Sequence, residues 1–566
     1  MKNKVKIIVL AMLTVFIGAC SLDLLDNPNA VTSKNTDLNY LLNNIQLNLA
    51  GSAGGSNNSH FNNLSDPGMR LVRMLNQGAA IYDNAVTPAS NVTTWNVAYA
   101  GILNDVKTLI PLAEKAELFA HAGAARIMRA YTLVTMVDAF GDIPLTEALN
   151  AENFNPKTDA GADVYKAALA DIDLGIANLV AKNKGGITSD LYFGGDVDKW
   201  TRLGNSLKLK ILLNLRLTDK AGSTSGINAL IAGNKLISTN AQNFAFKFGT
   251  NLTNPDTRHP RYGNQYTATG AGDYQSNAYM GTMYSAKGFP DPRIRFYFYR
   301  QTPTNSTDVN AIRCINNSKP AHYGAGDVYC YPTTVGYWGR DHLSNEGIPP
   351  DGLLRTAWGL YPAGGLFDTA VSLVGKKISV SLGAGGGGAG IHPIIMQSFV
   401  DFMLAESTLT LGTTGDAKAL LKSAIEKSMA DVRALALSTS EAGKIAAFEA
   451  DTTNGKAKIV WATEVTRYVT KVLADYDAAA NDDAKLNIIA TEYWIALHGN
   501  GIEAYNLYRR TGKPANQQPG LDPNYGAFVR SYYYPSSFIA NNSSAKQKAN
   551  VTLPVFWDTN PVGFVK

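Results

Sequence analysis

Residues 198–217 read DKWTRLGNSLKLKILLNLRL, and this stretch decides the fold class. Its apolar side chains recur every three or four residues, the spacing of one face of an α-helix; they are Trp200, Leu203, Leu207, Ile211 and Leu215. Lys199, Arg202, Lys208 and Arg216 fall on the other faces. Either Asp196 or Asp198 can cap the start of this helix. The stretch therefore predicts a long helix that buries one face.

The same spacing occurs on both sides of this stretch. Residues 121–139 repeat it upstream, and it returns after His392, where Ile395, Phe399, Phe402, Glu406 and Leu409 share a face. Further helices are expected at 416–435, 455–476 and 482–509. We therefore predict a mostly α fold with two helical parts, residues 36–239 and residues 392–510.

Residues 240–391, between the two helical parts, have a different composition. They are rich in Gly, Pro, Asn and Tyr, with strand-like pieces only at 244–248, 293–299 and 377–382. Long loops without secondary structure are uncommon in compact domains unless they carry function. We therefore predict a large irregular lobe, place ligand binding there, and expect residues 511–566 to form a loop-rich tail.

The first residues, MKNKVKIIVLAMLTVFIGAC, have the pattern of an export signal. Lys2, Lys4 and Lys6 precede an apolar run that is too short to span a bilayer as a helix, so residues 1–19 are predicted to be a signal peptide. Cys20 follows two small residues, as in the lipobox of bacterial lipoproteins. Lipid chains on this thiol would anchor the protein, at about 0.8 kcal/mol per buried methylene, with residues 20–35 as a tether. A plain secretory signal with an accidental cysteine is the alternative.

Composition narrows the class of ligand. The chain has 566 residues and a formal charge of +5, which falls to +2 without the three signal lysines. Nucleic-acid binding usually needs a concentrated basic face, so we expect no nucleic acid partner. Only 17% of the residues are charged and there are 27 tyrosines, a balance that suits uncharged polar ligands.

The motifs of the common catalytic sites are missing. Residues 383–390, GAGGGGAG, contain GxGxxG, but no βαβ unit or later acidic residue supports a dinucleotide site. The seven histidines never fall at metal-ligand spacing, and there is no GxSxG nucleophile elbow. We therefore expect no metal, no cofactor and no catalytic residue, although counting cannot exclude an unmarked glycosidase carboxylate pair.

The irregular lobe combines a cysteine pair with many aromatic rings. In an oxidising compartment, a Cys314–Cys330 disulfide is expected, although two separate thiols are the alternative. The disulfide would stiffen the loop that presents Tyr337 and Trp338. We predict that these two rings, together with Trp358, Tyr361 and Tyr274, stack on the ligand. The alternative is that these rings pack the lobe itself.

Motifs in both helical parts resemble those of the SusD/RagB family of outer-membrane nutrient-binding lipoproteins, in its SusD-like branch. They run in order from tether to tail and are LDLLDNPN (22–29), RAY (129–131), FGDIP (140–144), KW (199–200), NSLKLK (205–210), DPR (291–293), MLAE (403–406) and EAYNLYRRTG (503–512). The ordered set covers nearly the whole mature chain, while the irregular lobe contributes little.

The resemblance implies a single body, residues 20–566, of degenerate tetratricopeptide-type helix pairs with a loop-rich lobe packed on them. It also implies a non-enzymatic lipoprotein at the cell surface, anchored in the outer membrane. The implied partner is a SusC-like TonB-dependent barrel, and the implied ligand is an oligosaccharide or, in some members, a peptide. The alternative hypothesis is that the protein is a surface glycoside hydrolase.

Glu406 lies on the apolar face of its predicted helix, where an unpaired carboxylate would cost several kcal/mol. Arg509 and Arg510 end a helix that also carries Glu503. We therefore predict a structural ion pair between Glu406 and one of these two arginines.

Overall fold

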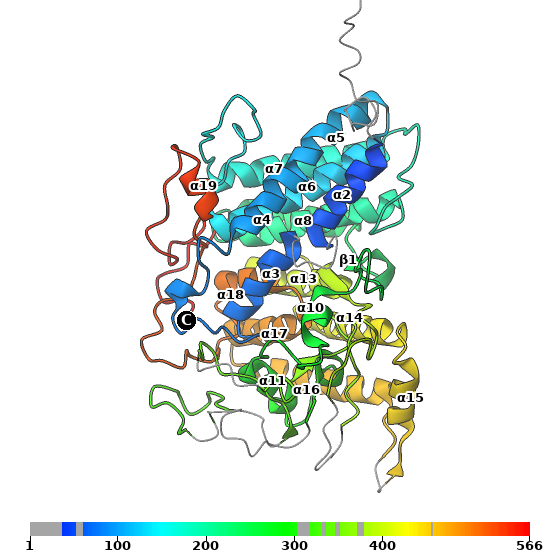
Figure 1. Cartoon of the computed structure of the whole chain (residues 1–566), viewed down its shortest axis with the longest axis vertical. Helices are drawn as coiled ribbons and strands as arrows, with labels where there is room; N and C mark the ends of the chain where they lie inside the picture. The colour runs from blue at the N-terminus through cyan, green and yellow to red at the C-terminus, as the bar shows by residue number, and fades with distance from the viewer. Residues whose placement is uncertain are drawn as a thin grey trace, which may run out of the picture.

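A computed structural model of the protein describes residues 37–51, 60–302, 314, 317–330, 335–345, 351–370, 379–453 and 457–566. Helices make up about half of this part and the sheets are small, so the predicted mostly α fold is confirmed. The N-terminal helices form the upper half of Figure 1 and the C-terminal helices the lower half. None of the described helices is both long and apolar enough to cross a membrane. The predicted signal, Cys20 and the tether lie outside the described residues.

The N-terminal helices pack in sequence order. They are α2 (Leu38–Ala50), α3 (His60–Leu71), α4 (Val92–Asn96), α5 (Asn104–Lys115), α6 (Phe119–Phe140), α7 (Gly161–Val180), α8 (Val197–Leu215) and α9 (Lys220–Gly233), with a 3-10 turn, η2 (Tyr82–Asn84), and a π-helical segment, η3 (Val97–Leu103). From α5 to α9 each helix packs against the next, as in stacked helix pairs. Helix α8 is the one predicted from residues 198–217. Asp196 is its cap, accepting the N–H groups of Asp198 and Lys199, and the predicted face is buried from Trp200 to Ile211.

The C-terminal helices form a second stack. They are α13 (Gln397–Leu411), α14 (Ala417–Leu437), α15 (Ala442–Ala450), α16 (Trp461–Ala478), α17 (Asp482–Ala496) and α18 (Gly501–Thr511), and the tail adds α19 (Ser536–Ala540). The single helix predicted over 482–509 is wrong, because two helices occupy it. Gly499 turns the chain at a φ of 98°, and the Asn500 side chain caps α18 by accepting the Glu503 N–H at 3.1 Å.

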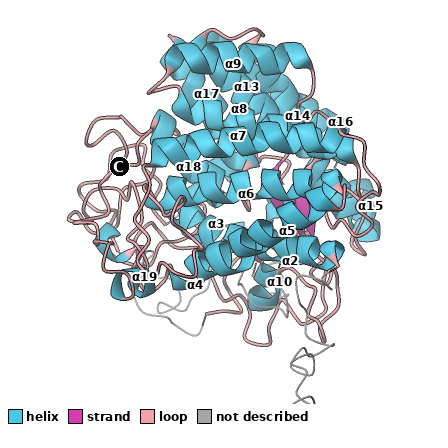
Figure 2. Cartoon of the chain, turned by 90° about the horizontal axis from the view of Figure 1, so that it is seen from above, coloured by secondary structure: helices cyan, strands magenta, loops and turns pink. Residues whose placement is uncertain are grey.

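The lobe contains only short elements among its loops. They are η4 (Asn240–Gln242), β1 (Phe244–Lys247), α10 (Pro260–Gln265), α11 (Asn277–Ser285), α12 (Ile294–Tyr297), β2 (Phe298–Tyr299), β3 (Ala357–Trp358) and β4 (Ile391–Ile395). Strand β1 pairs antiparallel with β4, and β2 with β3. The strand predicted at 293–299 is wrong in its first part, where α12 forms. Figure 2 shows how little strand lies among the helices.

The two helical stacks meet where α3 crosses α18. A Cβ on Gly501 would collide with the backbone of Ser65 and Met69, and one on Gly68 would collide with the Gly501 carbonyl. Two glycines at one crossing therefore let the helix backbones touch. Helices α8 and α13 also pack together, which brings Glu406 toward the N-terminal stack.

A buried ionic cluster fills this junction. The Arg510 guanidinium binds Glu406 in a bidentate pair, with Nε to Oε1 at 2.7 Å and Nη2 to Oε2 at 2.9 Å. Both side chains are at most 1% exposed, and Arg216 Nε lies 3.3 Å from the same carboxylate. Burial alone would raise the pKa of Glu406, but Arg510 and Arg216 together hold it below its ordinary value.

The other arginine of the predicted pair serves a different purpose. Arg509 donates to the carbonyl oxygens of Arg530 and Asp138 and lies over the Tyr505 ring at 3.8 Å. Lys210 of α8 pairs with Glu503 at 2.9 Å. In α18, Arg509 thus holds the tail, and Arg510 holds the helix junction.

Candidate ligand-binding site

A polar pocket of about 170 Å³ opens beside the Cys314–Cys330 disulfide, which the structure contains. We call it the disulfide-loop pocket. Its lining comes from the loop-rich lobe and one residue of the tail: Cys314, Asn317, Ser318, Pro320, Tyr329, Gly339, Arg340, Asp341, Ser344 and Leu521. Hydroxyl, amide, carboxylate and guanidinium groups converge here on a small space, as they do in small-molecule sites.

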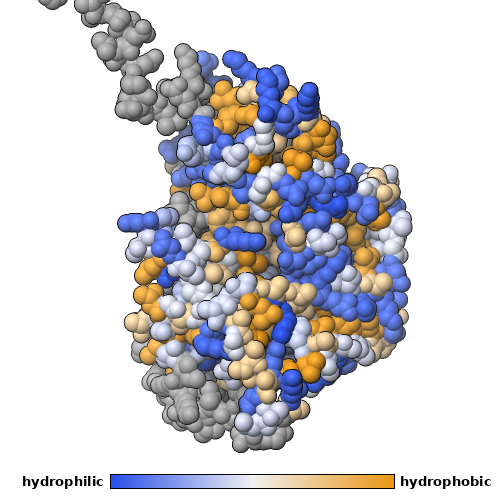
Figure 3. Space-filling view, turned by 90° about the vertical axis from the view of Figure 1, so that its right-hand side faces the viewer, coloured by the Kyte–Doolittle hydropathy of each residue, from blue (hydrophilic) through white to orange (hydrophobic). Residues whose placement is uncertain are grey.

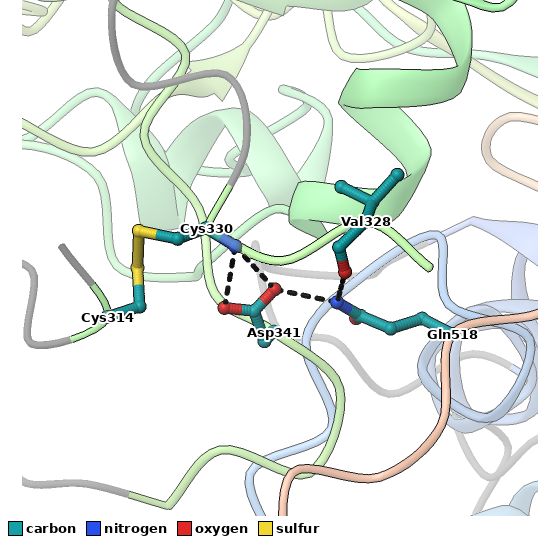
Figure 4. Close-up of a disulfide and its surroundings, with 5 residues drawn as sticks. All are labelled: Cys314, Val328, Cys330, Asp341 and Gln518. Atoms are coloured by element: carbon teal, nitrogen blue, oxygen red, sulfur yellow. Dashed lines mark hydrogen bonds between the residues drawn. A yellow bond between two sulfur atoms is a disulfide. The ribbon is translucent and has the colours of Figure 1, made fainter. Parts of the chain in front are cut away.

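Asp341 holds one wall of this pocket in place (Figure 4). It is 3% exposed, and its carboxylate accepts the Cys330 N–H at 3.2 and 3.3 Å and the Gln518 amide at 2.7 Å. Burial raises the pKa of the Asp341 carboxyl to about 6, although the bonds from Gln518 and Cys330 act in the opposite direction. The disulfide loop is therefore fixed to the C-terminal tail through one buried carboxylate.

Arg340 connects the pocket to Tyr274. Its guanidinium lies 4.4 Å from the centroid of the Tyr274 ring and donates to the ring hydroxyl at 3.1 Å. Arg355 also lies over this ring, at 3.9 Å, and the hydroxyl donates to Asp351 at 2.8 Å. Tyr274 is half-buried, so it keeps some exposed surface while two guanidinium groups fix its position.

The structure corrects the stacking-platform prediction for four of the five rings. Trp338, Tyr337 and Tyr361 are each 2% exposed, and Trp358 is fully buried. Trp338 packs against the disulfide from inside the lobe, and Trp358 stacks on His498 at 4.7 Å. In a lobe with few helices, large rings fill the space between loops, so the alternative of internal packing describes these four.

The structure brings to the pocket residues that the sequence did not single out. Arg340 and Asp341 follow Trp338 after one glycine, and two adjacent charges in a lobe poor in charge are a signal that could have found them. Gln518 reaches the site from 177 residues away, and nothing local marks it. Among the described residues, no group of three His, Cys, Asp or Glu side chains could hold a metal ion.

Helix stacks that carry a loop-rich lobe place the chain in the helical-repeat class of folds. A family model described as "Starch-binding associating with outer membrane" matches residues 28–322, over half of the chain. A second, described as "Susd and RagB outer membrane lipoprotein", matches residues 393–555. The chain therefore belongs to the SusD/RagB family of outer-membrane lipoproteins. Proteins of this family bind nutrients and glycans and are binding proteins rather than enzymes.

Solved structures share this fold. A chitin-binding protein is 18% identical, with a TM-score of 0.62 over 93% of this chain and 100% of that one. A SusD homologue from Bacteroides fragilis NCTC 9343 is 17% identical, with a TM-score of 0.63 over the same shares. A Bacteroidetes SusD-like protein, also 17% identical, reaches 0.65 over 93% and 100%. A search of curated proteins finds no match. Identities this low establish the fold alone.

Proposed function

We propose that the mature protein is lipidated at Cys20, is anchored at the cell surface and captures an oligosaccharide in the disulfide-loop pocket. It then delivers this ligand to a SusC-like TonB-dependent barrel in the outer membrane. Family membership supports the general role, since it implies a glycan ligand and a barrel of this type. The residues, the ligand class and the partner are our proposal.

The observation that carries the choice of site is the convergence of polar groups on the disulfide-loop pocket. Asn317, Ser318 and Ser344 offer donors and acceptors that suit sugar hydroxyls, while the half-buried Tyr329 offers apolar ring surface. The volume of about 170 Å³ lies below the range of roughly 300–1,000 Å³ that is usual for small-molecule sites. The pocket would therefore hold one unit of a longer chain.

The hydrolase alternative has one candidate acid in this pocket. Asp341 has the raised pKa that a general acid needs. However, it is 3% exposed, and the Cys330 N–H and the Gln518 amide already bond to its oxygens. These contacts favour a structural role for the Asp341 carboxylate over a catalytic one. A peptide ligand remains the second candidate, because the same donors and acceptors also suit a peptide backbone.

A polysaccharide panel tests the proposal directly. Starch, chitin and other glycans are cast into affinity gels, and retardation of the protein reports binding. A pool of peptides is tested separately by calorimetry. The release of reducing ends from the glycans is measured in parallel. We expect retardation by at least one glycan and no new reducing ends. Tyr329→Ala should weaken that binding at least ten-fold. The control is Tyr533→Ala, which removes a half-buried tyrosine of the tail outside the pocket. Binding only to peptides, or equal loss in both variants, would overturn the site and ligand.

The proposed lipid anchor and barrel partner have to be tested in cells. Cys20→Ala should release the protein from the outer membrane or leave it uncleaved, whereas the natural chain should remain membrane-bound and bring a barrel with it when purified in mild detergent. Unchanged fractionation of this variant would exclude the proposed anchor.

A further inference from the structure

An apolar pocket lies beside helix α15. It encloses about 220 Å³ and shares no lining residue with the disulfide-loop pocket. Its walls come from α12 and the segment before it, from the C-terminal end of α15 and from the start of α16. In Figure 1, α15 lies on the right-hand side, and Figure 3 views that side, where hydrophilic and hydrophobic side chains mix in small patches. We call this the α15 pocket.

Four aromatic side chains from different segments form a continuous wall of the α15 pocket. The ring centroid of Phe296 lies 5.5 Å from that of Trp461 and 5.0 Å from that of Phe367. Phe367 in turn lies 5.5 Å from Phe448. The two inner rings, Phe296 and Phe367, are at most 4% exposed, whereas the end rings, Trp461 and Phe448, are only half-buried. A ligand that enters from solvent can therefore reach the aromatic wall at both of its ends.

Two arginines hold the end rings of this wall in place. The Arg433 Cζ lies 4.9 Å from the centroid of the Trp461 ring, and the guanidinium forms a bidentate pair with Glu449, at 2.5 and 2.9 Å. The Arg295 Cζ lies 4.6 Å from the Phe448 centroid, and Nη1 of Arg295 donates to two backbone carbonyl oxygens, at 2.8 and 2.9 Å. Rings that are fixed before a ligand enters lose little conformational entropy when it binds. The wall is therefore preorganised.

The carboxylates that line the pocket already have partners, which indicates the charge of a ligand that would fit. Asp291 pairs with Arg293 at 2.6 Å. Glu464 pairs with Arg467 at 2.5 Å, and Glu449 belongs to the bidentate pair described above. Prolines and isoleucines make up most of the rest of the lining. A charged ligand would have to compete with the existing pairs, whereas a neutral ligand leaves them intact.

The size and chemistry of the pocket suit an aromatic ring better than a sugar. An apolar cavity of about 150 Å³ lined by Leu, Ile and Phe binds benzene, and sites for drug-sized ligands enclose roughly 300–1,000 Å³. The α15 pocket, at about 220 Å³, lies between these sizes. Aromatic rings also gain free energy from edge-to-face contacts beyond the burial of apolar area. A sugar would instead have to bury hydroxyl groups against the apolar wall, which costs free energy.

We propose that the α15 pocket is a binding site for a neutral small molecule that carries an aromatic ring, with this ring against the wall formed by Phe296, Phe367, Phe448 and Trp461. The proposal does not depend on what the disulfide-loop pocket binds, because the two pockets have no lining residue in common. The protein would thus have one site whose polar groups suit sugar hydroxyls and a second site whose rings suit an aromatic ligand.

The test uses saturation-transfer NMR on the full mature chain with benzyl alcohol, its saturated counterpart cyclohexylmethanol and methyl glucoside. We expect benzyl alcohol to bind more tightly than cyclohexylmethanol, although the latter is more hydrophobic, and methyl glucoside not to displace it. Phe448→Ala should weaken the binding of benzyl alcohol about five-fold or more, because it removes one end of the wall. Phe556→Ala is the matched control, since it removes a half-buried phenylalanine of the tail outside the pocket. It should change binding less than two-fold.

A second variant keeps the test decisive if Phe448→Ala does not fold. Ile459→Trp places a large ring at a half-buried position of the lining, keeps all four rings of the wall and should abolish the binding of benzyl alcohol. Binding that persists in the folded variants, or no binding of benzyl alcohol by the folded natural protein, would overturn the proposal. Equal binding of cyclohexylmethanol, or displacement by methyl glucoside, would overturn the aromatic ligand class. None of these results alters the polysaccharide gels for the disulfide-loop pocket, so the two proposals fail independently.

Discussion

The helical stacks and the irregular lobe satisfy their backbone carbonyl groups by different means. In the stacks, each carbonyl inside a helix bonds to an N–H four residues later, and side chains are free to pack. In the lobe, backbone bonds between loops share this work with arginine side chains. Arg300 donates to the carbonyls of Val335 and Ala370, at 2.9 and 2.5 Å, and Arg295 to those of Asp368 and Ala370, at 2.8 and 2.9 Å.

This difference explains how the described part of the lobe is held together with so little regular structure. Buried backbone groups must find partners, and a guanidinium with five donors can serve several loops at once. Arg300 also binds the Asp368 carboxylate at 2.6 Å. The stacks, by contrast, satisfy their carbonyls within the helices and use buried charges such as Glu406 and Arg510 to join one helix to another. Mutations should therefore act on whole-chain stability in the stacks and on local order in the lobe.

The largest effect is expected at the helix junction. Glu406→Ala would leave Arg510 and Arg216 buried without their shared carboxylate, which should destabilise the protein by about 3–5 kcal/mol. Urea unfolding followed by circular dichroism measures this. The control is Glu426→Ala, whose partner Lys422 is exposed, and it should cost less than about 1 kcal/mol. Equal losses in the two variants would show that the cluster does not hold the stacks together.

A tryptophan in each region separates global from local stability. Trp338→Ala removes the ring that packs on the disulfide and should cost about 3 kcal/mol, by the usual range for buried aromatic residues. Trp200→Ala in α8 removes a ring whose Nε1 donates to Asp190 at 2.8 Å. Hydrogen exchange should show faster opening of the lobe alone for the first variant and of the whole chain for the second. A loss of glycan affinity without any loss of stability in Trp338→Ala would contradict the internal packing of this ring.

Close contact between backbone segments in the lobe gives another specific prediction. Gly385 has a φ of 68°, and a Cβ there would collide with the Gly365 carbonyl. Gly385→Ala should therefore destabilise the lobe by about 2–4 kcal/mol, which combines the cost of the left-handed conformation and of overpacking. Gly383 has a φ of 80° but open space around its Cβ position. Gly383→Ala should cost only the conformational part, about 1–2 kcal/mol, and the melting temperatures of the two variants give the difference.

The same contrast explains which features the sequence could predict. Spacing of apolar residues marks a helix face locally, so the α8 stretch, its cap and the buried side of α13 follow from a few neighbouring residues. Pairing of Glu406 with an arginine follows from the cost of a lone buried charge. The lobe depends on contacts between distant loops, such as Asp341 with Gln518, that leave no periodic signal. The abundance of aromatic residues correctly indicated that the lobe differs from the helical parts, but it could not show whether Trp338 is buried or exposed.

The last prediction concerns the seam between the two regions, where His498 lies. Its ring, which follows α17, stacks on the lobe residues Tyr297 at 4.3 Å and Trp358 at 4.7 Å. Burial lowers the pKa of His498 to about 3, with the Tyr297 backbone acting weakly in the opposite direction.

Unfolding exposes this ring, which then takes up a proton below its ordinary pKa of about 6.5, while the folded protein does not do so until near pH 3. The stability that His498 contributes is therefore present above pH 6.5 and is lost as the pH falls, by about 2 kcal/mol at pH 5. His498→Phe keeps a flat ring in the stack and removes the titration. Between pH 7.5 and pH 5, this variant should lose about 2 kcal/mol less than the natural protein in urea unfolding. His322→Gln, which changes an exposed ring, is the control. An unchanged acid sensitivity in His498→Phe would mean that the seam opens before the stacks unfold, so that the lobe and the helices respond to acid separately.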